Sequence, residues 1–143
     1  MRALGVLTMV SAVALAGCAK PDGLQVVDPI IRLGASQRAP AVLYFTIKGG
    51  PTDDRLLSIS SPLVIRIALH ESMTKNGMAT MKDLDGGIDV PANSTIKFQE
   101  GGKHAMLFDV NPGVSANEKV QLNFTFASGT ILQTFAPTRA PGS

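Results

Sequence analysis

The sequence predicts an all-β domain, a sandwich or Greek-key barrel of about seven short strands. Two patterns predict this class. Apolar and polar residues alternate at period two while helical periodicity is weak after residue 23, and Gly or Pro interrupts the chain about every ten residues. The chain has 143 residues, of which 45% are apolar and 17% charged, so it can form one packed core and one domain.

The expected strands follow one another with short connections. In chain order they are predicted at residues 25–32, 41–48, 56–59, 63–70, 95–99, 104–110, 120–126 and 131–135, where 56–59 is a short strand additional to the seven. Ser128-Gly129 predicts the turn of a hairpin between the last two. Two strands carry apolar residues at every second position, which predicts one apolar face in each: Leu63, Ile65, Ile67 and Leu69 in the fourth, and Val120, Leu122, Phe124 and Phe126 in the seventh. We expect the domain to span residues 24–137 and residues 138–143 to form a loose tail.

The N-terminus has the pattern of an export signal. Arg2 is followed by 17 uncharged residues, 3–19, which are fewer than the about 20 of an ordinary membrane span. Near its end this stretch contains Leu15-Ala16-Gly17-Cys18, which resembles the bacterial lipobox. We therefore expect residues 1–17 to be removed, Cys18 to carry a lipid, and residues 18–23 to tether the domain to a membrane. The alternative is an ordinary signal peptide with an incidental cysteine.

Composition excludes several function classes. The net charge of +2 is too small for a nucleic-acid binder, which would show a basic stripe. A single cysteine allows neither an internal disulfide nor a thiolate zinc site. With two histidines and no recognisable Ser-His-Asp set, the chain is not expected to be an enzyme.

The soft metal ligands gather in one part of the chain. After the signal segment, every His and Met lies within residues 70–106: His70, Met73, Met78, Met81, His104 and Met106. His104 and Met106 alternate on one predicted strand and so face the same side. His70 is expected to end its strand, and residues 71–81 are polar and contain Gly, which predicts a loop or a loose hairpin whose methionines are not core filling.

Thioether and imidazole together suit Cu(I) better than calcium, magnesium or zinc. A simpler interpretation has the methionines filling gaps over the end of a sandwich and the histidines partly buried and hydrogen-bonded. Composition and spacing favour neither of these two interpretations over the other. Asp83, Asp85 and Asp89 lie near the cluster in sequence and are expected on a solvated loop face.

The spacing of four of these residues resembles the periplasmic copper chaperone family PCu(A)C. Ten residues separate His70 from Met81, 22 separate Met81 from His104, and one separates His104 from Met106. The family pattern is similar to within one residue in the long gap. The segments Gly86-Gly87-Ile88-Asp89-Val90-Pro91-Ala92 and Gly101-Gly102-Lys103-His104-Ala105-Met106-Leu107 also resemble family signatures.

This resemblance implies a cupredoxin-like domain that binds one Cu(I) per chain through four ligands: His70, Met81, His104 and Met106. It leaves Met73 and Met78 as possible auxiliary ligands. It implies a periplasmic carrier, and with the export signal we expect a Gram-negative bacterium. Monomer is the default state for a carrier. From the polar segment before Met81 we expect this residue to be mobile after a flexible loop, and we expect few charges at a small contact surface. The implied acceptor is the copper site of cytochrome c oxidase, reached directly or through a Sco-type thiol protein.

Three other functions stay open. A copper-resistance or storage lipoprotein would use the same site without a delivery partner. A structural or adhesive β-sandwich lipoprotein would bind no metal and would use its methionines as contact surface. A haem protein with His–Met ligation is disfavoured, because the sequence has no Cys-x-x-Cys-His and one tyrosine, Tyr44, to furnish a haem pocket.

Overall fold

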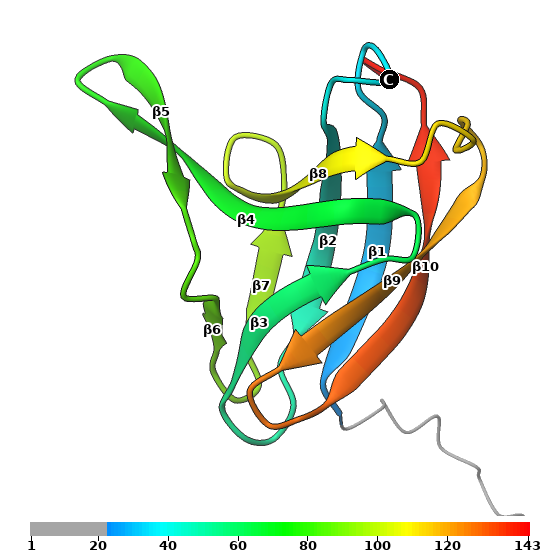
Figure 1. Cartoon of the computed structure of the whole chain (residues 1–143). Helices are drawn as coiled ribbons and strands as arrows, with labels where there is room; N and C mark the ends of the chain where they lie inside the picture. The colour runs from blue at the N-terminus through cyan, green and yellow to red at the C-terminus, as the bar shows by residue number, and fades with distance from the viewer. Residues whose placement is uncertain (1–22) are drawn as a thin grey trace, which may run out of the picture.

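The computed structural model describes residues 23–143, which form ten β-strands and no α-helix (Figure 1). The strands are β1 (Gln25–Arg32), β2 (Ala41–Lys48), β3 (Asp54–Ser60), β4 (Val64–Lys75), β5 (Met78–Asp83), β6 (Ile88–Val90), β7 (Thr95–Phe98), β8 (Lys103–Val110), β9 (Lys119–Phe126) and β10 (Ile131–Arg139). The predicted signal segment and Cys18 lie outside the described residues.

The strands make one continuous sheet that folds over on itself. Their order is β5-β4-β8-β7-β2-β1-β10-β9-β3-β6. Most neighbours are antiparallel, but β1 pairs with β10 in parallel, and β10 continues the sheet into β9. The strand β5 lies at one end of the order, so the β4–β5 hairpin has a free edge and projects beyond the rest of the molecule (Figure 1).

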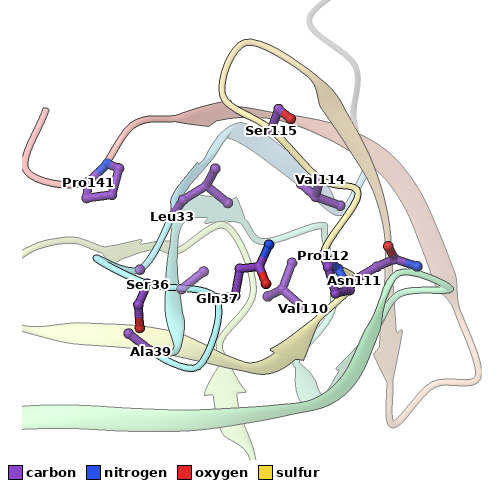
Figure 2. A pocket seen from close by; sticks show the side chains of 12 residues that line it. Leu33, Ser36, Gln37, Ala39, Val110, Asn111, Pro112, Val114, Ser115 and Pro141 are labelled. Atoms are coloured by element: carbon purple, nitrogen blue, oxygen red, sulfur yellow. The ribbon is translucent and has the colours of Figure 1, made fainter.

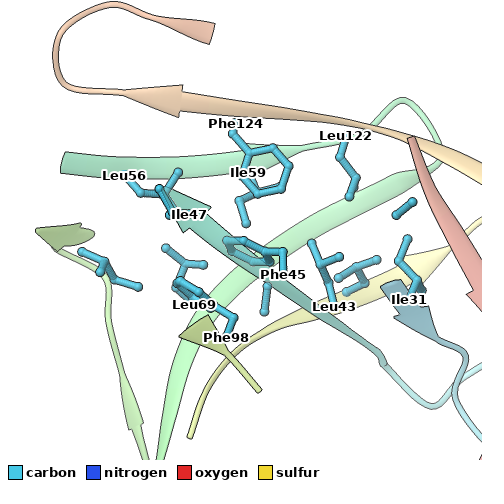
Figure 3. Packing of buried hydrophobic residues seen from close by; sticks show 14 of the residues in the cluster. Ile31, Leu43, Phe45, Ile47, Leu56, Ile59, Leu69, Phe98, Leu122 and Phe124 are labelled. Carbon is cyan, nitrogen blue, oxygen red and sulfur yellow. The ribbon is translucent and has the colours of Figure 1, made fainter. Parts of the chain in front are cut away.

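The core lies between the two halves of the folded sheet. Phe45 on β2 stacks on Phe98 of β7 with ring centroids 4.0 Å apart, and meets Phe124 of β9 edge-on at 4.9 Å. Phe124 approaches from the opposite half of the sheet, so this aromatic trio joins the two layers (Figure 3). Leu43 and Ile47 extend the same buried face along β2.

Most sequence expectations for the core are confirmed. Strands β1 and β2 have the predicted bounds. The predicted face of β9 is buried at all four positions: Val120, Leu122, Phe124 and Phe126. The predicted apolar face of β4 is wrong in part, because Ile65 is 83% exposed whereas Leu69 is buried. Ile65 follows Val64, which is buried in the core cluster, so the expected alternation is not kept at the start of β4.

The number of strands exceeds the seven expected. The short strand β6 is not among the predicted strands, because it directly follows Gly86-Gly87, which is typical of a turn. Gly87 has φ +81°, and a Cβ there would lie 2.3 Å from the carbonyl oxygen of Leu56, so glycine lets this turn press against β3. The expected tail is also wrong at its start, since β10 runs to Arg139 and Thr138 is fully buried.

Of the two alternatives predicted for residues 71–81, the structure has the hairpin and not the loop. The β4–β5 hairpin is regular rather than loose, and its ladder runs from His70 opposite Asp83 to Lys75 opposite Met78. Two residues, Asn76 and Gly77, connect the strands with φ of 53° and 74°. Positive φ at both positions defines a type I′ turn, for which Asn-Gly is the strongest sequence signal. That dipeptide could have predicted the hairpin.

Within residues 23–143, no helix is both long and apolar enough to cross a membrane.

The aromatic trio gives a direct test of the core. Replacing Phe45 with Ala should lower the free energy of unfolding by about 3–5 kcal/mol, because it removes a buried ring from both of its partners. Phe135→Ala is the matched control, since Phe135 is 55% exposed, and should change stability little. Urea unfolding of both variants measures the difference. Equal losses would contradict this account of the core.

Candidate metal centre

The register of three neighbouring strands places the four predicted ligands on one face. His70 on β4 lies opposite His104 on β8, and Ala68 lies opposite Met106. On its other side β4 pairs with β5, where Ser72 lies opposite Met81. Directly opposed residues point to the same side of a sheet, and alternate residues on a strand share that side. His70, Met81, His104 and Met106 therefore all lie on the face turned away from the core.

Two of these positions differ from expectation. His70 was expected at the end of a strand and Met81 after a flexible loop. His70 lies inside β4, which continues to Lys75, and Met81 lies within β5. His70 is thus held by neighbours on both sides, whereas Met81 belongs to a strand with one free edge.

His104 is held by the glycine turn that precedes it. Its side chain is buried, and its Nδ1 lies 3.0 Å from the carbonyl oxygen of Gly102. A carbonyl can only accept, so Nδ1 carries the proton and Nε2 keeps its lone pair. The same carbonyl accepts the backbone N–H of Ser72 at 3.0 Å, which ties the turn to β4. Gly101, with φ +78°, permits the turn.

His70 has a different partner. Its side chain is 12% exposed, and its Nε2 lies 3.0 Å from a carboxylate oxygen of Asp83. Its Nδ1 is buried and has no hydrogen-bond partner among the described residues. The rings of His70 and His104 meet edge-on with centroids 5.8 Å apart. Each imidazole therefore has one nitrogen engaged and the other without a protein partner.

The contact from Asp83 is the feature that sequence reasoning missed. Asp83 was expected on a solvated loop face together with Asp85 and Asp89. All three are exposed as expected, but two of them lie on strands and not in a loop. Asp83 on β5 contacts His70, and Asp89 on β6 pairs with Arg55, whereas Asp85 lies in a turn. The signal lay in the hairpin register, because an Asn-Gly turn at 76–77 puts residue 83 opposite residue 70.

The two sulfur ligands differ in accessibility. Met81 is 56% exposed, whereas Met106 is half-buried beside Val42 of β2. The centre therefore has a buried side built from two imidazoles and an open side at Met81. Among residues 23–143, no three His, Cys, Asp or Glu side chains are close enough to hold a metal ion without the methionines.

Met73 and Met78 do not share the face of Met81. Met73 lies opposite Thr80, and Met78 lies opposite Lys75. Alternation along both strands therefore turns these two side chains to the other side of the hairpin. They are 45% and 69% exposed. The sheet geometry separates them from the four-ligand face.

One phenol and one ion pair border this face. Tyr44 lies two residues after Val42 on β2, so both side chains point to the same side of the sheet. Burial raises the pKa of the Tyr44 hydroxyl, the charge of nearby Arg32 lowers it, and the charge of Glu100 raises it further. The Arg32 guanidinium lies 5.6 Å from the centre of the Tyr44 ring and pairs with Glu100 at 3.6 Å. Tyr44 therefore stays neutral at physiological pH and adds no charge to this face.

A separate cavity lies at the far end of β8. It has a volume of about 310 Å³ and is lined by residues such as Leu33, Gln37, Val110 and Val114 (Figure 2). No His, Met or charged residue lines it. Val110 lies six positions after His104 on β8, which corresponds to about 20 Å. The cavity is therefore distinct from the face that carries the histidines.

Comparison with known proteins shows which family the chain belongs to. The family described as "Putative lipoprotein LpqE-like" matches residues 24–138. The chain belongs to the LpqE-like family. It is 28% identical over 119 residues to "Putative lipoprotein Lxx21020" of Leifsonia xyli, covering 82% of this chain and 70% of that protein. It is 26% identical over 91 residues to the uncharacterized protein RP573 of Rickettsia prowazekii, covering 63% of this chain and half of that protein.

Solved structures share the fold of this LpqE-like chain. The copper-bound PCuAC domain from PmoF2 superposes with a TM-score of 0.67 at 18% identity, covering 82% of this chain and 93% of that domain. The solution structure of CuI-DR1885 from Deinococcus radiodurans gives 0.63 at 22% identity, covering 87% and 83%. The all-β, cupredoxin-like class expected from the sequence is confirmed.

The difference in exposure among the four methionines predicts an order of oxidation. In the metal-free domain, dilute peroxide should convert Met78, Met81 and Met73 to sulfoxides before the half-buried Met106, because oxidation follows exposure. Peptide mapping over time measures each rate. Oxidation of Met106 as fast as that of the hairpin methionines would contradict the placement of Met106.

Proposed function

We propose that this LpqE-like protein is a membrane-anchored carrier of Cu(I), not an enzyme, and that copper is its cargo. One observation carries the proposal. Two imidazoles with an unpartnered nitrogen each, from His70 and His104, share a face with two thioethers, from Met81 and Met106. The copper-bound states of the PmoF2 domain and of DR1885, which have the same fold, support it.

The donor set favours a soft monovalent ion. Thioether sulfur is uncharged and soft, and imidazole is intermediate, so the four donors match Cu(I). Calcium and magnesium require oxygen donors, and the face offers one carboxylate, that of Asp83, already in contact with His70. Zinc prefers thiolate or a larger set of imidazoles and carboxylates. We infer one Cu(I) per chain.

The open side of the centre suits release of the ion. The imidazoles are buried and held by strands on both sides, while Met81 is 56% exposed on the edge strand. A partner's ligand can therefore displace Met81 first and take the ion by stepwise exchange. A small, transient interface with a monomeric carrier is sufficient for such a transfer.

We propose that the carrier works in the periplasm of a Gram-negative bacterium, anchored to a membrane. The predicted lipid on Cys18 and the lipoprotein description of the family support the anchor. The proposed acceptor is the copper site of cytochrome c oxidase, directly or through a Sco-type thiol protein.

A paired set of methionine variants tests the site. Met81→Leu with Met106→Leu should weaken Cu(I) binding by more than the roughly 10–100-fold that loss of an outer-shell partner costs. Leucine keeps the apolar bulk but removes the sulfur. Anaerobic competition against a colorimetric Cu(I) chelator measures the affinity.

Met73→Leu with Met78→Leu is the matched control, because it removes two hairpin sulfurs from the opposite face. This variant should keep the affinity of the unaltered domain. Equal losses in the two double variants, or tight binding that survives the loss of Met81 and Met106, would overturn the site.

Delivery and storage are separated by the phenotype of a deletion strain. Loss of the gene should lower the copper content and activity of cytochrome c oxidase while copper tolerance is retained. If copper tolerance is lost while the activity of cytochrome c oxidase is unchanged, the same site serves copper resistance or storage instead of delivery.

A further inference from the structure

We infer that Asp83 is a positioning residue that fixes the tautomer of His70 and so makes Nδ1 its donor atom toward Cu(I). His104 presents the opposite nitrogen, Nε2. The inference deepens the proposed function, on which its copper-dependent part rests. Its other part, the tautomer of His70 in the metal-free protein, stands on the structure alone.

Asp83 contacts one nitrogen of His70. Nε2 of His70 lies 3.0 Å from a carboxylate oxygen of Asp83, a normal distance for an N–H donor to a carboxylate. Turning the ring over would place Cε1 at that position. A C–H···O contact has its usual distance at about 3.3–3.6 Å, so the shorter distance of this contact favours the ring orientation that has nitrogen at this position. An ionised carboxylate only accepts, hence Nε2 carries the proton.

The second step concerns the other nitrogen. Nδ1 of His70 is buried and has no hydrogen-bond partner among the described residues. Buried polar atoms are nearly always satisfied, so an orphaned lone pair needs an explanation. A bound metal ion supplies one, because a neutral imidazole with a protonated Nε2 can bind a metal only through Nδ1.

The third step compares the two histidines. Gly102 accepts from Nδ1 of His104, and Asp83 accepts from Nε2 of His70. Each imidazole thus has an outer partner that fixes its ring, an arrangement common around metal ligands. The two partners engage opposite nitrogens, so the donors toward the ion are Nε2 from one ring and Nδ1 from the other.

One strand supplies both a ligand and this outer partner. Met81 and Asp83 are alternate residues on β5 and share the face of His70. Displacement of β5 from β4 would therefore remove a thioether and release the fixed tautomer of His70 together. The Asp83 side chain is 70% exposed, so the contact depends on the hairpin register and not on burial.

The test uses residues 19–143, which contain all ten strands and the whole core cluster. Histidine labelled with ¹⁵N reports the tautomer of each ring at pH 8, with and without one equivalent of Cu(I). Asp83→Leu removes the acceptor, and Asp83→Asn keeps an acceptor while removing the charge. The matched control is Asp85→Leu, which removes an exposed carboxylate two residues farther along.

The metal-free domain should show His70 protonated at Nε2 and His104 at Nδ1. Cu(I) should then perturb Nδ1 of His70 and Nε2 of His104. Asp83→Leu should mix the tautomers of His70 and weaken Cu(I) binding about 10–100-fold, and Asp83→Asn should restore the Nε2-protonated form. Asp85→Leu should change neither property.

Two results are distinguishable failures. If the domain binds no Cu(I) but His70 has the expected tautomer, the proposed function fails and the positioning contact stands. If Cu(I) binds tightly and Asp83→Leu leaves both tautomer and affinity unchanged, the role of Asp83 is overturned and the copper site stands.

Discussion

The antiparallel register of β4 against β8 is the constraint on which the site depends. It sets His70 opposite His104 and leaves Met106 one diagonal step away. The residues between these ligands, among them Leu69 and Ala105, are buried in the core. A slip of one residue would turn the ligands inward and the core residues outward. Hydrophobic burial therefore fixes the face on which the histidines stand, so the energy that folds the sheet also assembles the site.

The same sheet gives the site a fixed side and an accessible side. Both imidazoles stand on paired strands and are held by outer hydrogen bonds, whereas Met81 stands on the edge strand of a projecting hairpin. A permanently bound metal ion would be retained better by four buried ligands. A centre whose exposed donor lies at a free edge is suited to an ion that must be handed over, which is why the geometry favours a carrier.

The sequence predicted the class of fold because alternation is a local pattern, and it identified β9 and its buried face. The four proposed ligands follow from the resemblance of their spacing to a known family, and the structure places all four on one face. The misses at the site have one cause, which is that cross-strand register cannot be read from composition. The Asn76-Gly77 turn makes a regular hairpin where a loop or a loose hairpin was expected, places Asp83 opposite His70, and turns Met73 to the opposite face. Ile65 is exposed although Val64 beside it is buried, so alternation in the sequence did not predict which side chain faces the core at the start of β4.

X-ray absorption of the Cu(I)-loaded domain decides whether these four side chains bind the ion, because it counts the atoms around the metal without altering the protein. We expect two sulfur and two nitrogen neighbours, the thioethers of Met81 and Met106 and the imidazoles of His70 and His104. A shell of nitrogen and oxygen alone would contradict this donor set, and so would a shell of sulfur alone.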